Sequence, residues 1–100
     1  MILELATIDI KIGSNAEFEH NLEKAQAVVA KSKGYLGHQF QKCIETENRY
    51  TLFIHWENLE AHTIGFRESE LFKEWRALIG PYFETPPIVQ HYQIILSSIK

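Results

Sequence analysis

Residues 50–56 carry the clearest strand pattern in the chain, and the short segment before them limits the possible folds. They read YTLFIHW, which is rich in aromatic and β-branched side chains. Residues 35–44 (YLGHQFQKCI) form another strand pattern, and only the polar residues 45–49 separate the two. A connection this short joins antiparallel strands, because a parallel pair requires a crossover of about a dozen residues or more. The middle of the chain is therefore predicted to be a β-hairpin.

An amphipathic helix is predicted before this hairpin. It follows a strand pattern at residues 2–12, in which apolar and polar side chains alternate. Ser14 and Glu17 form a capping-box signature at its start, and Gly34 lies just past its end. Its apolar stripe recurs at helical spacing and consists of Phe18, Leu22, Ala25 and Val29.

A second helical pattern follows the hairpin and runs from Leu59 to Ile79, with Asn58 as its cap. A break is expected between Gly65 and Ser69, and Gly80-Pro81 ends the pattern. A last strand pattern occupies residues 88–96.

The predicted order of elements is therefore strand, helix, strand, strand, helix, strand. Two βαβ halves of this kind form a ferredoxin-like β-α-β-β-α-β fold, an antiparallel sheet with both helices on one face. We predict this α+β class in place of a doubly wound sheet, because a turn and not a helix joins the two middle strands. One hundred residues accommodate a single domain, residues 1–100.

Apolar side chains occupy both faces of the predicted sheet. In residues 50–56, one face carries Tyr50, Leu52, Ile54 and Trp56, and the other carries Thr51, Phe53 and His55. In residues 88–96, we assign Ile88, Tyr92, Ile94 and Leu96 to the helix-facing set, which leaves Val89, His91 and Ile95 for the other face. Two helices cover one face, so a second copy of the sheet is the simplest cover for the other, and we predict a homodimer. The alternative is that these apolar residues are tolerated singly on the surface.

Charge and composition exclude several classes of partner. The formal net charge is −3, and the lysines and arginines are scattered along the chain, so neither nucleic acid nor an anionic membrane surface is an expected partner. No stretch approaches the ~20 apolar residues of a membrane span. Cys43 is the single cysteine, and Glu4 and Asp9 interrupt the first apolar run, which argues against a signal peptide. These features predict a cytoplasmic protein.

Several short motifs occur in a particular order. They are GYLG at 34–37, WENLEAH at 56–62, GFRES at 65–69, FKEW at 72–75 and PIVQHY at 87–92. None is diagnostic alone, but together they span nearly the whole chain and resemble the antibiotic biosynthesis monooxygenase family. The resemblance implies a dimeric α+β barrel, in which two ferredoxin-like sheets pack face to face and each protomer holds a pocket between sheet and helices. It also implies oxidation of polycyclic aromatic or quinol-type substrates by molecular oxygen with no metal or flavin, so no cofactor is expected.

One branch of that family degrades haem with an Asn on the first strand and a Trp and a His in the second helical region. Residues 2–12 contain no Asn, and Trp75-Arg76 stand near the position of that His, so haem degradation is not expected. The chain instead resembles a subgroup with the pattern H-x-x-G-F-R-x-S, which His62, Phe66, Arg67 and Ser69 match.

The implied chemistry requires a base, a donor for a developing oxyanion and a dry aromatic pocket. His62 is the predicted base or orienting donor, because it follows the end of a strand where a pocket would open. Arg67 is the predicted partner of an anionic substrate oxygen. The alternative for Arg67 is an ion pair with a neighbouring glutamate, namely Glu60, Glu68 or Glu70.

Aromatic side chains are the predicted pocket walls, and they are Phe66, Trp75, Tyr82 and Trp56. Phe72 and Trp75 share a helix face, an arrangement that is also typical of core packing. His38, His55 and His91 lie within strands and are interpreted as core or interface residues satisfied by hydrogen bonds, whereas His20 is expected in solvent.

Other site classes lack their signatures. No His/Cys/Asp/Glu cluster has a ligand spacing such as HExxH or CxxC, so no metal site is predicted. The fold alone does not distinguish the monooxygenase from two alternatives on the same scaffold. One is a protein that binds a small hydrophobic ligand without converting it, and the other is a structural dimer with a collapsed pocket.

Overall fold

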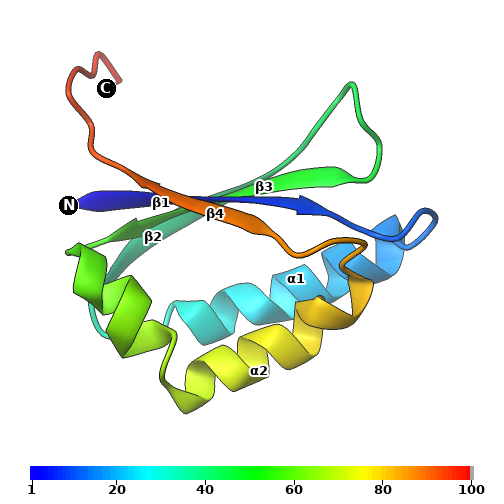
Figure 1. The fold of residues 1–100 in the computed structure, drawn as a ribbon, viewed down its shortest axis with the longest axis horizontal. Helices are drawn as coiled ribbons and strands as arrows, with labels where there is room; N and C mark the ends of the chain where they lie inside the picture. Colours follow the sequence, from blue (N-terminus) through cyan, green and yellow to red (C-terminus); the bar gives the residue numbers. More distant parts are fainter. Residues whose placement is uncertain (100) are drawn as a thin grey trace.

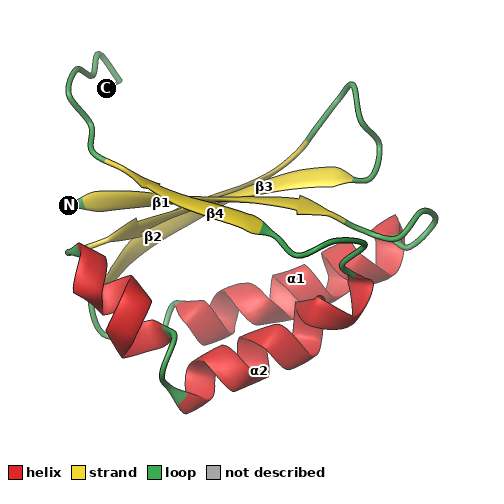
Figure 2. Ribbon diagram, in the orientation of Figure 1, coloured by secondary structure: helices red, strands yellow, loops and turns green. Residues whose placement is uncertain are grey.

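The computed structural model of the chain describes residues 1–99, and the six predicted elements are present in the predicted order (Figures 1 and 2). They are β1 (Ile2–Asp9), α1 (Asn15–Val29), β2 (Tyr35–Lys42), β3 (Arg49–Trp56), α2 (Glu70–Ile79) and β4 (Ile88–Tyr92). The strands form a 4-stranded sheet in the order β2-β3-β1-β4, and every neighbouring pair is antiparallel. Both helices lie on the same face of the sheet (Figure 1). The predicted ferredoxin-like α+β fold is therefore confirmed.

The core lies between the sheet and the helices. Pairing of β1 with β3 places Ile8 opposite Tyr50 and Ala6 opposite Leu52, and all four are buried. Every second residue of β3 is buried, so the predicted division of that strand into two faces is confirmed. The helices contribute the other half of the core, chiefly Phe18, Leu22, Ala25, Val29, Phe66, Trp75 and Ile79.

The last strand departs from its prediction in length and in orientation. It ends at Tyr92 and not at residue 96. Val89 pairs with Ala6 and His91 with Glu4, so Val89 and His91 face the helices, whereas Ile88 is 63% exposed on the opposite face. The predicted assignment of the two faces was wrong. Its cause is the period of two residues, since a shift of one residue exchanges the two sides of a strand.

The two helix starts also differ from each other. α1 begins directly after Ser14 as predicted, but the capping box is absent, because the Ser14 hydroxyl donates to the carbonyl of Lys11 and caps no backbone N–H of α1. Ser69 does cap α2, since its hydroxyl oxygen accepts a hydrogen bond from the backbone N–H of Phe72. The predicted cap at Asn58 is confirmed by a 2.8 Å hydrogen bond from the N–H of Ala61.

The predicted break in the second helical region is present and has a distinct geometry. Residues Ala61–Phe66 form a π-helical segment, η1, which a loop separates from α2 (Figure 2). A hydrogen bond of 3.0 Å from the N–H of Arg67 to the carbonyl of His62 closes one of the wider turns. His62 and Phe66 are the buried residues of η1, so this segment presents both toward the sheet. The short 3-10 turn η2 (Gly80–Tyr82) follows α2.

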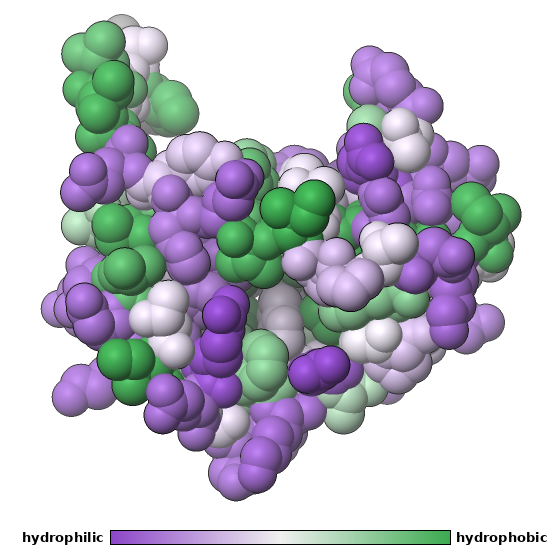
Figure 3. All heavy atoms as spheres, viewed as in Figure 1, coloured by the Kyte–Doolittle hydropathy of each residue, from purple (hydrophilic) through white to green (hydrophobic). Residues whose placement is uncertain are grey.

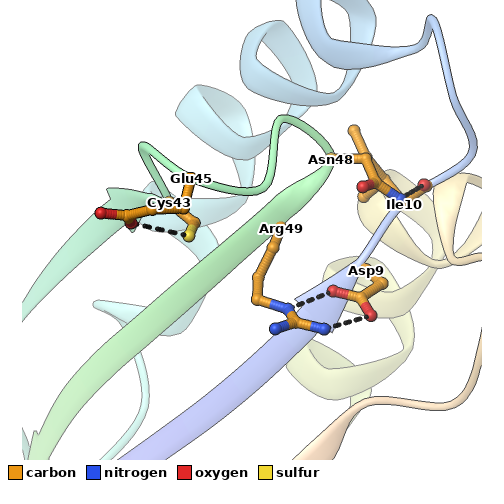
Figure 4. A network of polar contacts seen from close by, with 6 residues as sticks. All are labelled: Asp9, Ile10, Cys43, Glu45, Asn48 and Arg49. Atoms are coloured by element: carbon orange, nitrogen blue, oxygen red, sulfur yellow. Dashed lines mark hydrogen bonds and ion pairs between the residues drawn. The ribbon is translucent and has the colours of Figure 1, made fainter.

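A polar network joins the β2–β3 turn to the end of β1 (Figure 4). Arg49 donates to both carboxylate oxygens of Asp9 at 2.8 and 3.1 Å, and this contact holds the pKa of Asp9 below its ordinary value. The side-chain amide of Asn48 donates to the carbonyl of Ile10 at 2.8 Å. The network therefore holds the turn between β2 and β3 against the end of β1. No helix within residues 1–99 is both long and apolar enough to cross a membrane.

Candidate active site

A cavity of about 470 Å³ lies between the sheet and the second helical region. Side chains of β1, β3 and β4 form one side of it, and η1, α2 and residues 83–87 form the other. Its apolar lining includes Ile8, Leu52, Ile54, Phe66, Phe72, Trp75, Ile79, Phe83 and Val89. The volume is in the range of pockets that enclose a small organic molecule. The lining favours a flat, apolar ligand, since aromatic rings supply much of it.

Glu4 supplies a carboxyl group to this otherwise apolar cavity. It occupies the helix-facing side of β1 and is only 6% exposed. The indole N–H of Trp56 donates to its Oε1 at 2.8 Å, and the Nε2 atom of His62 lies 3.3 Å from the same oxygen. Burial raises the pKa of Glu4 to about 7, because desolvation outweighs the opposing effects of the Trp56 hydrogen bond and the Arg67 charge. The carboxyl group therefore changes its charge near neutral pH.

His62 lies beside Glu4 and is also enclosed. It is 2% exposed, and its ring stacks on Trp56 with a centroid distance of 5.3 Å. Its Nδ1 atom lies 2.8 Å from Nε2 of His91. Burial, together with the smaller effects of the charges of Arg67 and His91, lowers the pKa of His62 to about 4. The ring is therefore neutral at pH 7 and carries one N–H.

His91 completes a row of three titratable groups. It stands opposite Glu4 in the pairing of β1 with β4. Unlike His62 and Glu4, which are buried, it is partly exposed. Burial and the charge of Arg67 lower the pKa of His91 as well. The row therefore leads from the cavity to the surface of the protein at β4.

Arg67 stands at the opening of the cavity, with an exposed side chain. It takes part in none of the ion pairs found within residues 1–99. The alternative of an ion pair with Glu60, Glu68 or Glu70 is therefore wrong for the described structure. The guanidinium group has no carboxylate partner there and faces the entrance to an apolar space.

The structure brings together only some of the residues singled out in the sequence. Phe66 and Trp75 line the cavity beside His62 and Arg67. Tyr82 lies elsewhere, since its hydroxyl accepts a hydrogen bond of 2.9 Å from Asn21. Trp56 is fully buried behind Glu4 and contributes its N–H without lining the cavity.

The remaining four histidines fall at four different places. His38 is bonded to Tyr35 and Gln26, and His91 to His62, so both are satisfied as expected. His55 lies on the open face of the sheet with no side-chain hydrogen bond to residues 1–99. His20 is exposed, as predicted.

Glu4 is the site residue that sequence reasoning missed. Its signal was available, because Glu4 alternates with Ala6, Ile8 and Ile10 on the side of β1 that is otherwise apolar. A carboxyl group on a buried strand face is rare without a partner or a function. Within residues 1–99, no group of three or more His, Cys, Asp or Glu side chains is placed to hold a metal ion.

The chain is similar to one protein family and to several known proteins. Residues 1–78 match the model of the family described as Antibiotic biosynthesis monooxygenase. The chain is 40% identical over 93 residues to the uncharacterized protein YczJ of Bacillus subtilis, a match that covers 93% of this chain and 98% of YczJ. It is 30% identical over 60 residues to the mycobilin-producing heme oxygenase of Mycobacterium tuberculosis, covering 60% of this chain and 57% of that enzyme.

Solved structures also share the fold, and two of them illustrate the similarity. A Bordetella bronchiseptica protein classed with the antibiotic biosynthesis monooxygenases superposes with a TM-score of 0.92 at 38% identity, covering 95% of this chain and 97% of the other. SnoaB, a cofactor-independent oxygenase from Streptomyces nogalater, superposes with a TM-score of 0.82 at 13% identity, covering 99% and 97% of the two chains. At that identity the second similarity concerns the fold alone.

Proposed function

Because the chain belongs to the antibiotic biosynthesis monooxygenase family, we propose that it oxidises a small aromatic or quinol-type molecule with molecular oxygen and without a metal or organic cofactor. The observation that carries this proposal is the cavity, in which aromatic side chains surround a buried Glu4–His62 pair. Arg67, which has no ion-pair partner in residues 1–99, stands at its entrance. SnoaB, which shares the fold, is a cofactor-independent oxygenase, and this supports the proposed class of reaction.

Such a reaction depends on the substrate becoming an anion. Removal of a proton from an electron-rich phenol or anthrone gives an anion that transfers an electron to oxygen directly. An enclosed apolar site favours this step, because it excludes water and strengthens the electrostatic contacts inside. Arg67 at the entrance is suited to hold the substrate oxygen on which negative charge develops. His62 is neutral at pH 7, its Nδ1 is hydrogen-bonded to His91 and its Nε2 lies 3.3 Å from Glu4, so it is suited to the orienting role and not to that of the base.

Haem is a less suitable substrate, although one relative is a heme oxygenase. His62 is the histidine that lines the cavity in residues 1–99, and its two ring nitrogens face Glu4 and His91. Neither nitrogen is therefore free to bind the iron of a haem.

Oxygen uptake by the purified, metal-free protein tests the proposal. A panel of anthrones and hydroquinones would be assayed, with the autoxidation rate of each compound subtracted. We expect protein-dependent uptake for at least one compound, and a loss of at least about tenfold in kcat/KM in Arg67→Ala. Lys73→Ala is the matched control, because it removes an exposed positive charge of α2 that does not line the cavity.

A different outcome would favour the alternative of a binding protein. In that case a small apolar compound would co-purify with the chain or bind in the cavity, and no compound of the panel would be consumed. An absence of both binding and uptake would favour a structural dimer.

We further propose that two copies pair through the sheet face that carries no helix. This face presents Leu3, Leu5 and Phe53, together with the more exposed Ile88 and Tyr92. The segment after β4 extends from the sheet on the side away from the helices and forms a hydrophobic projection (Figures 1 and 3). Within it Ile95 is 88% and Leu96 90% exposed, which is unusual for a monomer in water.

A second copy is the occupant that fits this face, since a self-complementary apolar surface related by twofold symmetry buries both sheets at once. Light scattering during size exclusion should give the mass of two chains of 11.7 kDa each. Phe53→Glu should reduce that mass to one chain, because it places a charge in the proposed interface. A monomeric wild-type protein at micromolar concentration would contradict the proposal.

A further inference from the structure

We propose that Glu4 is the proton acceptor of the site, and that His62 and His91 are positioning residues whose hydrogen-bonded rings hold its carboxylate at the cavity and link its charge to solvent at β4. This inference rests on the proposed oxygenase function, for which it names the acceptor. It starts from the two oxygens of the carboxylate, which have different surroundings.

The Oε1 atom of Glu4 is fully engaged, whereas Oε2 is open. Oε1 faces both the indole N–H of Trp56 at 2.8 Å and the Nε2 atom of His62 at 3.3 Å. Oε2 receives no hydrogen bond from residues 1–99. Every fully enclosed side-chain nitrogen or oxygen in that range has a partner, so Oε2 is not fully enclosed. Because Glu4 lines the cavity, we infer that this oxygen faces it. This oxygen has the free lone pairs that a proton acceptor needs.

His62 does not offer such a lone pair. Its Nε2 faces Glu4 and its Nδ1 faces His91, so both ring nitrogens are used within the row. The neutral ring has one N–H, and an ionised Glu4 can only accept a hydrogen bond. These two facts decide which ring nitrogen carries the proton. The Nε2–H of His62 donates to Glu4, and its Nδ1 accepts from Nε2–H of His91.

A protonated Glu4 reverses this arrangement. This reversal requires the proton on Oε1, which half a turn of the carboxyl group achieves for a proton accepted at Oε2. The hydroxyl then donates to Nε2 of His62, and Nδ1–H of His62 donates to Nε2 of His91. The proton exchanged with solvent is the one on Nδ1 of His91, which is partly exposed. The tautomers of both histidines therefore depend on the charge of Glu4, and neither ring needs to become a cation. The other groups that face the row are Arg67 at the entrance and the neutral Trp56.

The proposed proton transfer balances with the oxygenase reaction. A C–H or O–H bond of the substrate breaks, its electron pair stays on the substrate, and an O–H bond forms at Oε2 of Glu4. Molecular oxygen, the co-reactant of the proposed function, takes up the electrons and forms a peroxide anion on a substrate carbon. Glu4 returns its proton to this peroxide, which loses water and leaves a carbonyl group. The site then carries an ionised Glu4 once more.

The first test uses oxygen uptake as a function of pH. We expect kcat/KM of the wild type to rise with pH as Glu4 ionises, and Glu4→Gln to lower it by at least about 100-fold. His62→Gln, which acts on positioning, should retain measurable turnover and shift the pH at which activity appears. Glu74→Gln is the matched control, since it removes an exposed carboxylate of α2 that lies outside the cavity. Uptake by the wild type that Glu4→Gln leaves unchanged would overturn the inference while the proposed function stood.

The second test requires no turnover. Ring-nitrogen NMR shifts of His62 and His91 would be followed from pH 5 to 9 in the wild type and in Glu4→Gln. We expect both rings to exchange tautomers together near the pH at which Glu4 titrates, and to keep one arrangement in Glu4→Gln. Independent titration of the two rings, or the same behaviour in both proteins, would overturn the inference. Coupled tautomers without oxygen uptake would instead refute the proposed function and keep the coupling.

Discussion

Replacement of Glu4 by glutamine is expected to stabilise the protein at alkaline pH. Glutamine has nearly the shape of glutamate, and its carbonyl oxygen can accept the hydrogen bond that Trp56 donates. It removes the carboxyl group, whose ionisation is unfavourable in a site only 6% exposed. The substitution therefore removes an electrostatic penalty and conserves the packing.

The magnitude follows from the pKa of Glu4, which burial raises from 4.5 to about 7. The difference of about 2.5 corresponds to roughly 3 kcal/mol at ~1.4 kcal/mol for each pKa unit. Below pH 4.5 the carboxyl group is protonated in both the folded and the unfolded chain. Between pH 4.5 and 7 the unfolded chain releases the proton and the folded chain retains it, so the wild type loses stability as pH rises. Glu4→Gln has no such loss, and its advantage should therefore reach about 3 kcal/mol above pH 7.

Urea denaturation at pH 4.5 and pH 8.5, at one fixed protein concentration, measures this advantage. Glu74→Gln serves as the control, because its exposed carboxylate should give no comparable difference between the two pH values. If the free energy of unfolding of Glu4→Gln follows that of the wild type at both pH values, folding leaves the pKa of Glu4 near its ordinary value. The reasoning about its burial would then be refuted.

Three further substitutions test local features of the structure. Trp56→Phe removes the N–H that lowers the pKa of Glu4, so carboxyl NMR should place the Glu4 titration at higher pH than in the wild type, and an unchanged titration would contradict that contact. Ser69→Ala should reduce the free energy of unfolding by about 1 kcal/mol in urea, since α2 loses its cap; no loss would mean that the cap is unimportant. Gly34→Ala should destabilise the protein by more than about 1 kcal/mol, because Gly34 has a φ of +88° and its new Cβ would lie 2.6 Å from that of Ala61. Gly13→Ala is the matched control at a φ of +87° with no atom within 4 Å, and equal losses would show that backbone strain alone is responsible.

The order of elements could be predicted from the sequence because it depends on local patterns. The alternation in residues 50–56 and the helical spacing of Phe18, Leu22 and their neighbours each reflect a period that one segment contains by itself. The cap at Asn58 is local for the same reason. Once the short turn between the middle strands is recognised, few arrangements of a sheet with two helices remain. The motifs that carry the family resemblance lie within these same segments.

The site depends on contacts that no segment contains by itself. Glu4, His62 and His91 lie on β1, η1 and β4, and they meet because the pairing of β1 with β4 sets Glu4 opposite His91. A different register would have turned His91 to the open face, which is how the sequence pattern alone was interpreted. The charge states of Glu4 and His62 likewise depend on how completely the helices exclude water from them. Periodicity determines which residues share a face, whereas only the packed structure decides which faces meet and how much water is left between them.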